Sequence, residues 1–220
     1  MGNRLQTNQY NLSVEGETEQ WYFEWLEEQI NKCPKRKYNV SLRAKKCPSP
    51  RKYYKSINNL TKPFVYHICD VESKDPVHVD KFSQILLEMK EAKQQKKVSY
   101  ELGYSNFAFE LWIVLHKIDF NGCQTHRSHY LTPINKIFGE KFLNLDQYKN
   151  EANYKRCINK LSLDDVINAI KRAEKIQADN IAFGNKKICL HGYEYYEDNP
   201  ALSINDVIKK ILTECGIIKK

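Results

Sequence analysis

The first 30 residues combine a short alternating run with a segment of helical periodicity. Leu12 and Val14 alternate with polar neighbours, as in a half-buried strand, and this run stops at Glu15 and Gly16. Four apolar residues then recur on one helical face, namely Trp21, Tyr22, Trp25 and Leu26. The pattern predicts a strand, a tight reversal that Gly16 permits, and a helix.

Strand-like and helix-like segments continue to alternate up to about residue 120. Strands are expected at 38–42, at 64–69 and near 98–102, and helices at 51–60, 76–96 and 109–116. The run at 64–69, FVYHIC, is apolar throughout, which is typical of a strand buried on both faces of a parallel sheet. Strands that alternate with helices in this way predict an α/β fold with a parallel sheet flanked by helices.

The last hundred residues show helical periodicity. Two helices are expected to begin at Ser162 and Ser203, each in a sequence that resembles a capping box. We therefore predict that residues 1–120 form an α/β core with a basic insertion around 32–62. Residues 121–220 are then a mostly helical C-terminal elaboration of the same domain.

The composition of the 220 residues is that of a soluble globular protein, 41% hydrophobic and 28% charged. No apolar stretch approaches the roughly 18 residues that a membrane helix needs, and the amino terminus lacks the apolar core of a secretory signal. The seven cysteines include no CxxC pair, and Cys123, His126 and His129 match no zinc spacing. We expect a cytoplasmic protein without membrane contact.

The net charge of +8 comes from one region. Eleven of the 35 Lys and Arg lie between Gln29 and Cys69, where Asp and Glu are absent, so the rest of the chain has 24 basic and 27 acidic residues. Tyrosines are interleaved with these cations, a composition suited to phosphate contacts and base stacking. Nucleic acid is the predicted ligand, and the candidate contacts are Lys45, Lys46, Arg51, Lys52 and Lys55. A solvated basic loop, or a surface for an acidic protein partner, is the alternative.

Carboxylates follow two of the predicted strands. Glu15 ends the first strand, and Asp70 and Glu72 follow the buried run at 64–69. Because carboxyl ends of parallel strands meet at one edge of a sheet, these acids can converge and hold Mg²⁺ or Mn²⁺. Ordinary structural roles also exist, since acids in a first helical turn, such as Glu19, complement the helix dipole. Glu110, within the apolar run FELWIVLH, needs a cation, metal or hydrogen-bond partner.

Four motifs together resemble the RloB family, Toprim-like proteins of bacterial phage-defence and restriction-associated loci. The family is related to the AbiL second component and to OLD-type nucleases. The motifs are EGETE at 15–19 followed by Tyr22 and Phe23, DVE at 70–72, SNFAFELW at 105–112 ending at His116, and Asn199-Pro200.

The resemblance implies a Toprim-like, Rossmannoid fold and a metal-dependent nuclease, often encoded beside an SMC/ABC-like ATPase that controls it. Glu15 corresponds to the catalytic Toprim glutamate, Asp70 and Glu72 to the metal-binding pair. Glu19 and Glu110 would complete a two-metal site. Glu72 departs from the usual aspartate. A family Tyr-x-Lys-like segment, whose lysine would be catalytic, corresponds either to Lys149 or to Lys155, and the sequence leaves both open.

Two functions follow as hypotheses. The first is a nuclease that hydrolyses DNA or RNA, including transfer RNA, as effector of an anti-phage or abortive-infection system. The second is a binding or sensor subunit whose Toprim site is vestigial and which acts by docking an ATPase.

Overall fold

The central sheet has the strand order β2-β1-β3-β4-β7. The computed structural model describes residues 5–57, 63–95 and 98–219. Four strands run parallel, namely β1 (Thr7–Val14), β2 (Asn39–Lys46), β3 (Phe64–Val71) and β4 (Ser99–Asn106). The short β7 (Ala201–Leu202) is antiparallel to β4. The predicted α/β fold with a mostly parallel sheet is confirmed.

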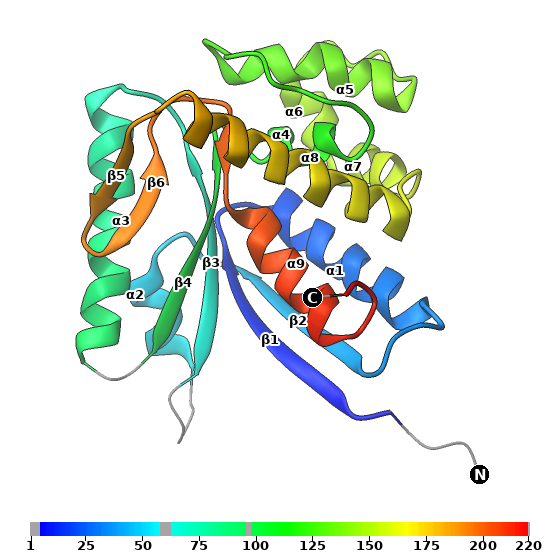
Figure 1. Ribbon diagram of the computed structural model, residues 1–220, viewed down its shortest axis with the longest axis horizontal. Coiled ribbons are helices and arrows are strands. Elements are labelled where there is room, and N and C mark those ends of the chain that lie inside the picture. Colours follow the sequence, from blue (N-terminus) through cyan, green and yellow to red (C-terminus); the bar gives the residue numbers. More distant parts are fainter. Residues whose placement is uncertain (1–4, 58–62, 96–97, 220) are drawn as a thin grey trace.

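Helices cover both faces of this sheet (Figure 1). On one face, Leu12 and Ile68 lie in a core cluster with residues of α1 (Glu17–Lys32), α4 (Glu110–Leu115), α8 (Leu163–Ala182) and α9 (Ile204–Glu214). On the other face, Val65 and Cys69 of β3 pack with α3 (Pro76–Gln94). Strand β3 thus contributes alternate side chains to both clusters, which explains why its sequence is apolar throughout.

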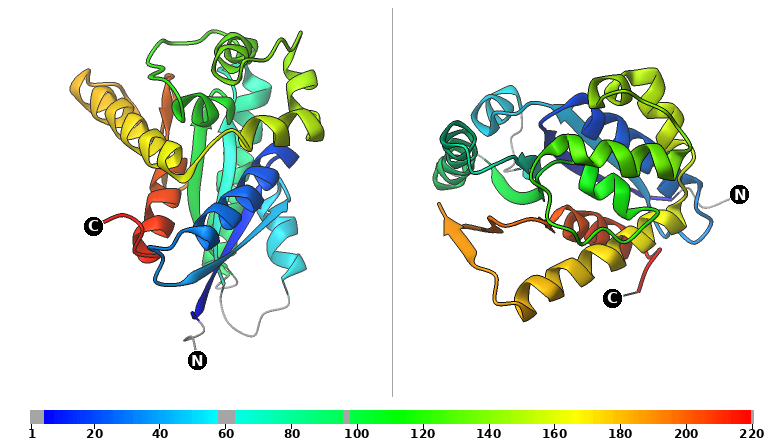
Figure 2. Two further views of the ribbon diagram at one scale, coloured as in Figure 1. Left: turned by 90° about the vertical axis from the view of Figure 1, so that its right-hand side faces the viewer. Right: turned by 90° about the horizontal axis from the view of Figure 1, so that it is seen from above.

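The carboxyl ends of the parallel strands are covered by a group of short helices. These are the 3₁₀ helix η1 (Arg127–Tyr130), α5 (Leu131–Phe138), α6 (Leu145–Lys149) and α7 (Glu151–Ile158). Figure 2 shows them above the end of the sheet at which β1, β3 and β4 terminate. The chain returns from them along α8, whose first turn has the predicted capping box between Ser162 and Asp165.

The C-terminal part also contains strands that its sequence pattern did not predict. Strands β5 (Lys187–Leu190) and β6 (Tyr193–Tyr196) form a hairpin, and β7 joins the main sheet. The hairpin turns at His191 and Gly192, which both have positive φ, as a two-residue turn of the type I′ class requires. In the sequence, the pair His191-Gly192 is the signal that could have predicted this turn.

The predicted capping box at Ser203 is wrong. The Ser203 side chain caps no helix N–H. Its hydroxyl accepts a hydrogen bond from the Tyr104 N–H and donates one to the Leu102 carbonyl, so it links β4 to the start of α9.

Helix α2 (Pro50–Ser56) is shorter than the helix predicted at 51–60, although positions 58–62 lie outside the described residues. Positions 96 and 97, at the end of the helix predicted at 76–96, also lie outside them. Within the described ranges, no helix is both long and apolar enough to cross a membrane.

Candidate active site at the carboxyl end of the sheet

The turn from β1 to α1 brings Glu15 and Glu19 to the edge of the sheet. Gly16 has an extended backbone (φ −128°, ψ 179°), which any residue adopts, so the predicted need for a tight reversal is not the reason for a glycine here. A Cβ atom on Gly16 would instead lie 2.6 Å from Glu19 Oε2. Thr18 Oγ1 donates to the same oxygen at 3.1 Å. Glycine leaves room for the buried Glu19 carboxylate, which folds back against the turn.

The end of β3 places a second pair of acids beside the first. Strands β1 and β3 pair in parallel with Val14 opposite Ile68, and Glu15 Oε2 accepts a hydrogen bond from the Asp70 N–H at 3.1 Å. Burial raises the pKa of Asp70 well above its usual range, and the neighbouring Glu15 and Glu19 carboxylates raise it further. The predicted convergence of acids from two strand ends is therefore observed.

Lys81 of α3 lies between the acids of these two strands. Its Nζ is 2.6 Å from Glu15 Oε1 and 3.0 Å from Glu72 Oε1. His78 Nε2 lies 3.3 Å from the other Glu72 oxygen, and Ser73 Oγ is 2.7 Å from His78 Nδ1. Burial alone would raise the pKa of Glu72, but the hydrogen bond and charge of Lys81 lower it overall. Glu72 is therefore held as a carboxylate by surrounding cations.

Glu110, at the start of α4, has the partner that its buried position requires. Its side chain is 1% exposed, and Lys149 Nζ lies 2.9 Å from its Oε1. Its Oε2 is buried without a hydrogen-bond partner among the described residues. Burial lowers the pKa of Lys149, but Glu110, Asp70 and Glu19 together raise it to about 12. Lys149 is thus a fixed positive charge that faces three carboxylates.

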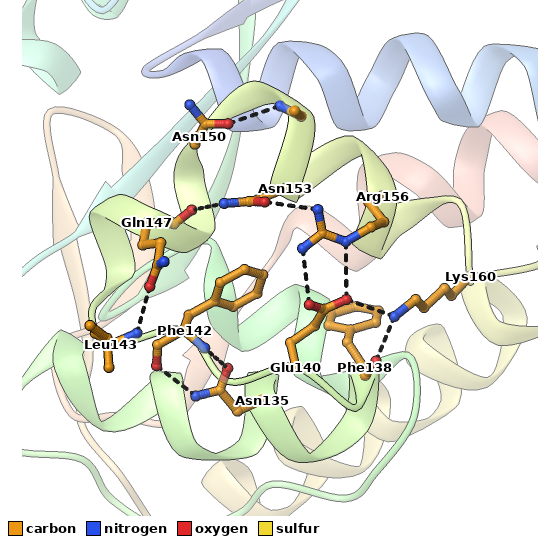
Figure 3. Close-up of polar contacts among 11 residues, drawn as sticks. Asn135, Phe138, Glu140, Phe142, Leu143, Gln147, Asn150, Asn153, Arg156 and Lys160 are labelled. Carbon is orange, nitrogen blue, oxygen red and sulfur yellow. Dashed lines mark hydrogen bonds and ion pairs between the residues drawn. The ribbon is translucent and has the colours of Figure 1, made fainter.

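A polar network links the end of α5 to α6 and α7 (Figure 3). Asn144 and Asn150 cap α6 and α7, and Asn153 Nδ2 donates to the Gln147 carbonyl at 2.7 Å. The Glu140 carboxylate accepts hydrogen bonds from Arg156 and Lys160, and these hydrogen bonds lower the pKa of Glu140 to about 2. Since Lys149 is the last residue of α6, these contacts hold the helix end that carries it.

A cavity of about 420 Å³ lies beside these contacts. Its lining includes five carboxylates and Lys149; the carboxylates are Glu15, Glu17, Glu19, Asp70 and Glu72. His126 and Arg127, from the loop that leads into η1, also line it. Sequence reasoning missed Arg127 and Lys81. Neither belongs to a recognisable motif, so no local signal marked them, and the spacing of His126 from Cys123 and His129 matches no zinc site.

Lys155, the other candidate for the catalytic lysine, lies elsewhere. It pairs with Glu151 at 2.6 Å on the exposed side of α7, and its Nζ lies 5.6 Å from the centre of the Trp21 ring. It does not belong to the cavity lining, whereas Lys149 does. The structure therefore separates two lysines that the sequence left equivalent.

Comparison with known families agrees with this arrangement of motifs. The sequence model of the RloB-like proteins matches residues 10–211. The chain belongs to the RloB-like family. The matched span of this RloB-like chain contains every acid of the cavity as well as Lys81 and Lys149. Neither the curated proteins nor the solved structures include one that matches it significantly.

Within the basic segment of this RloB-like protein, Lys46 is the residue that contacts the cavity lining. Lys46 pairs in register with Val14 at the carboxyl end of β2, and its Nζ is 3.3 Å from Glu17, which lines the cavity. Lys45 donates to Ser56, and Arg51 pairs with Glu91 of α3. The remaining predicted contacts, Lys52 and Lys55, are exposed on α2.

A divalent metal fits the donors of the site but not their present spacing. Across residues 5–57, 63–95 and 98–219, no three carboxylate, imidazole or thiol side chains converge closely enough to hold an ion. Carboxylate oxygens are nevertheless the donors that Mg²⁺ and Mn²⁺ prefer, and Glu110 Oε2 is a buried oxygen without a partner among these residues. The Lys81 ammonium lies between Glu15 and Glu72, and the Lys149 ammonium pairs with Glu110.

Proposed function

We propose that this protein is a metal-dependent nuclease that hydrolyses phosphodiester bonds in DNA or RNA. One observation carries the proposal. Five carboxylates from two parts of the chain, the β1–α1 junction and the end of β3, line a single cavity together with Lys149, whose ammonium also pairs with the buried Glu110 at the start of α4. Such a concentration of buried like charge is costly for folding, and it is typical of sites that bind cations for catalysis.

In the proposed site, Asp70, Glu72 and Glu15 would hold Mg²⁺ or Mn²⁺, and Glu19 and Glu110 would complete a second metal position. When bound, the metal supplies an activated water and neutralises phosphate charge. Glu15, which already receives the Asp70 N–H, acts as general base or acid. The ammonium of Lys149 stabilises the charge that develops on the phosphate in the transition state.

The substrate and biological role are part of the same proposal. Lys46 and its neighbours at the carboxyl end of β2 offer phosphate contacts next to the cavity. Transfer RNA is one candidate substrate, and an SMC/ABC-like ATPase is the candidate partner. In this view the protein is the effector of an anti-phage or abortive-infection system.

The test is cleavage of nucleic acid with Mn²⁺ by a double variant, Asp70→Ala with Glu72→Ala. We expect loss of cleavage with the fold retained, measured by circular dichroism. The matched control is Glu24→Ala with Glu28→Ala, which removes two acids from the exposed side of α1 and should cleave like the wild type. Cleavage by the Asp70 and Glu72 variant at the wild-type rate would refute the proposed mechanism.

A second candidate is a binding or sensor subunit that docks an ATPase and has a vestigial site. It is favoured by the observation that Glu15, Glu72 and Glu110 are already paired with the ammonium groups of Lys81 and Lys149. Isothermal titration calorimetry with Mg²⁺ and Mn²⁺ distinguishes the two. Absence of binding at millimolar metal, in a complex that retains its activity, would favour the sensor.

A further inference from the structure

Lys81 makes a contact that the proposed metal site does not use. Its ammonium joins an acid from the end of β1 to an acid from the end of β3, at 2.6 Å from Glu15 Oε1 and 3.0 Å from Glu72 Oε1. It reaches these oxygens from the second turn of α3, and its side chain is 48% exposed. A lysine thus bridges the two sequence motifs that identify the candidate site.

A metal ion and this ammonium cannot occupy the same place. Mg²⁺ binds carboxylate oxygens at about 2.0–2.1 Å, so an ion shared by Glu15 and Glu72 would lie between the two oxygens that Lys81 now contacts. Like charges would also repel at that distance. The imidazole of His78 lies 3.3 Å from the second Glu72 oxygen, so the position between the two acids is filled by Lys81.

We infer that Lys81 is a built-in counter-ion of the metal-free site, which a divalent metal must displace from Glu15 and Glu72 in order to bind. The inference rests on the metal binding of the proposed function and adds a regulatory element to it. Lysine suits this role because its ammonium is a point charge on a flexible stem, which can leave while its helix stays in place. The strength of the two ion pairs then sets the metal concentration at which the site is loaded.

The experiment is calorimetric titration of the intact protein with Mn²⁺ alone, in four forms. Lys81→Met removes the competing charge, and its Kd should fall by about 3- to 10-fold, as expected for the loss of two partly exposed ion pairs. Lys81→Arg keeps the positive charge, and its guanidinium can bind a carboxylate through two hydrogen bonds. The Kd of this variant for Mn²⁺ should therefore equal or exceed that of the wild type. Lys90→Met, an exposed lysine of the same helix, is the matched control and should leave Kd unchanged.

Thermal unfolding gives a second readout that does not depend on activity. In EDTA, Lys81→Met leaves Glu15 and Glu72 without their counter-ion, so its melting temperature should lie about 2 to 4 °C below the wild type. In saturating Mn²⁺ the deficit should disappear or reverse, because the metal replaces the lost charge and binds the variant more tightly. Lys90→Met should follow the wild type in both conditions.

The possible results separate this inference from the nuclease proposal. Equal Mn²⁺ affinity in the wild type and Lys81→Met would overturn the counter-ion role and leave the nuclease proposal standing. Failure of both forms to bind Mn²⁺ at millimolar concentration would overturn both. The expected order of affinities in a protein that cleaves no nucleic acid would support the counter-ion role and count against the nuclease.

Discussion

The ammonium of Lys149 lies 2.9 Å from the carboxylate of Glu110, although 38 residues separate them in the chain. The sequence predicted that Glu110, in an apolar helix, needs a partner, and this prediction is confirmed. The contact also brings a cation into the cavity formed by the acids of β1 and β3. It thereby selects one of two lysines as the candidate for catalysis.

The two lysines should differ sharply in their effect on cleavage. We predict that Lys149→Met lowers the rate of Mn²⁺-dependent cleavage by about 100- to 1000-fold, the range for removing one preorganised group that stabilises transition-state charge. Lys155→Met, its matched control, removes an exposed partner of Glu151 and should change the rate less than twofold. Single-turnover cleavage assays measure both. Similar losses of cleavage rate in the two variants would show that a lysine's proximity to the cavity does not determine its part in catalysis.

The basic segment should contribute to affinity and not to catalysis. We predict that replacing Lys45, Lys46, Arg51 and Lys52 with Ala weakens nucleic-acid binding and flattens its salt dependence. Each lost phosphate contact should reduce the slope of log K against log salt by about 0.7 to 0.9. Fluorescence anisotropy at several salt concentrations measures the slope, and Mn²⁺ affinity should not change.

A matched control removes four exposed lysines outside the segment, Lys171, Lys175, Lys186 and Lys219. It has the same change of net charge and should keep the wild-type slope. If the variant of the basic segment keeps its slope but no longer binds the ATPase, this surface docks a protein and the nucleic-acid assignment is wrong.

Gly16 offers a test of the position of Glu19. We predict that Gly16→Ala weakens Mn²⁺ binding by about 10-fold, because the added Cβ would lie 2.6 Å from Glu19 Oε2 and must push that carboxylate away. The free energy of unfolding should change by less than about 1 kcal/mol, since the backbone at Gly16 is extended and suits alanine. Calorimetry and chemical denaturation give the two quantities.

Gly122→Ala is the control for this change. Gly122 has an open environment in which the nearest atom to an added Cβ is Gln124 Nε2 at 3.5 Å. It should alter neither metal affinity nor stability. Unchanged Mn²⁺ binding in Gly16→Ala would mean that Glu19 contributes no ligand.

His116 should make stability depend on pH. Its Nδ1 donates to the Trp112 carbonyl at 2.8 Å, so its Nε2 accepts from the Tyr22 hydroxyl at 3.0 Å, and the imidazole is neutral. Burial lowers the pKa of His116 to about 4, against an ordinary value near 6.5. The unfolded chain therefore binds this proton first, and stability falls as pH decreases from about 6.5 to 4, by up to about 3 kcal/mol.

The measurement compares wild type and His116→Gln by chemical denaturation between pH 7 and 4. The variant lacks the titrating group, so the stability gap between the two proteins should narrow toward pH 4. His129→Gln, which alters an exposed imidazole, should leave the gap to wild type constant. A gap of constant size for His116→Gln would show that its imidazole does not titrate in this range.

Local sequence patterns were sufficient to predict the core of the fold. The alternation around Leu12, the helical face of α1 and the apolar run of β3 each follow from burial of neighbouring residues, which a sequence records directly. The meeting of Glu15 with Asp70 was also predictable, because parallel strands end at one edge of a sheet. Strand β7 was not, since it is two residues long and exists only through its pairing with β4.

The sequence by itself determined the acids of the site and the edge of the sheet where they meet. Only the tertiary structure decided which cations face them. Lys149 reaches Glu110 through the packing of short helices, and Lys81 reaches Glu15 across 66 positions of the chain. A lysine on a solvent-facing helix has the same local pattern whether it points to water or to a buried carboxylate. The partner of a charge depends on the path of the whole chain, and no short-range periodicity encodes it.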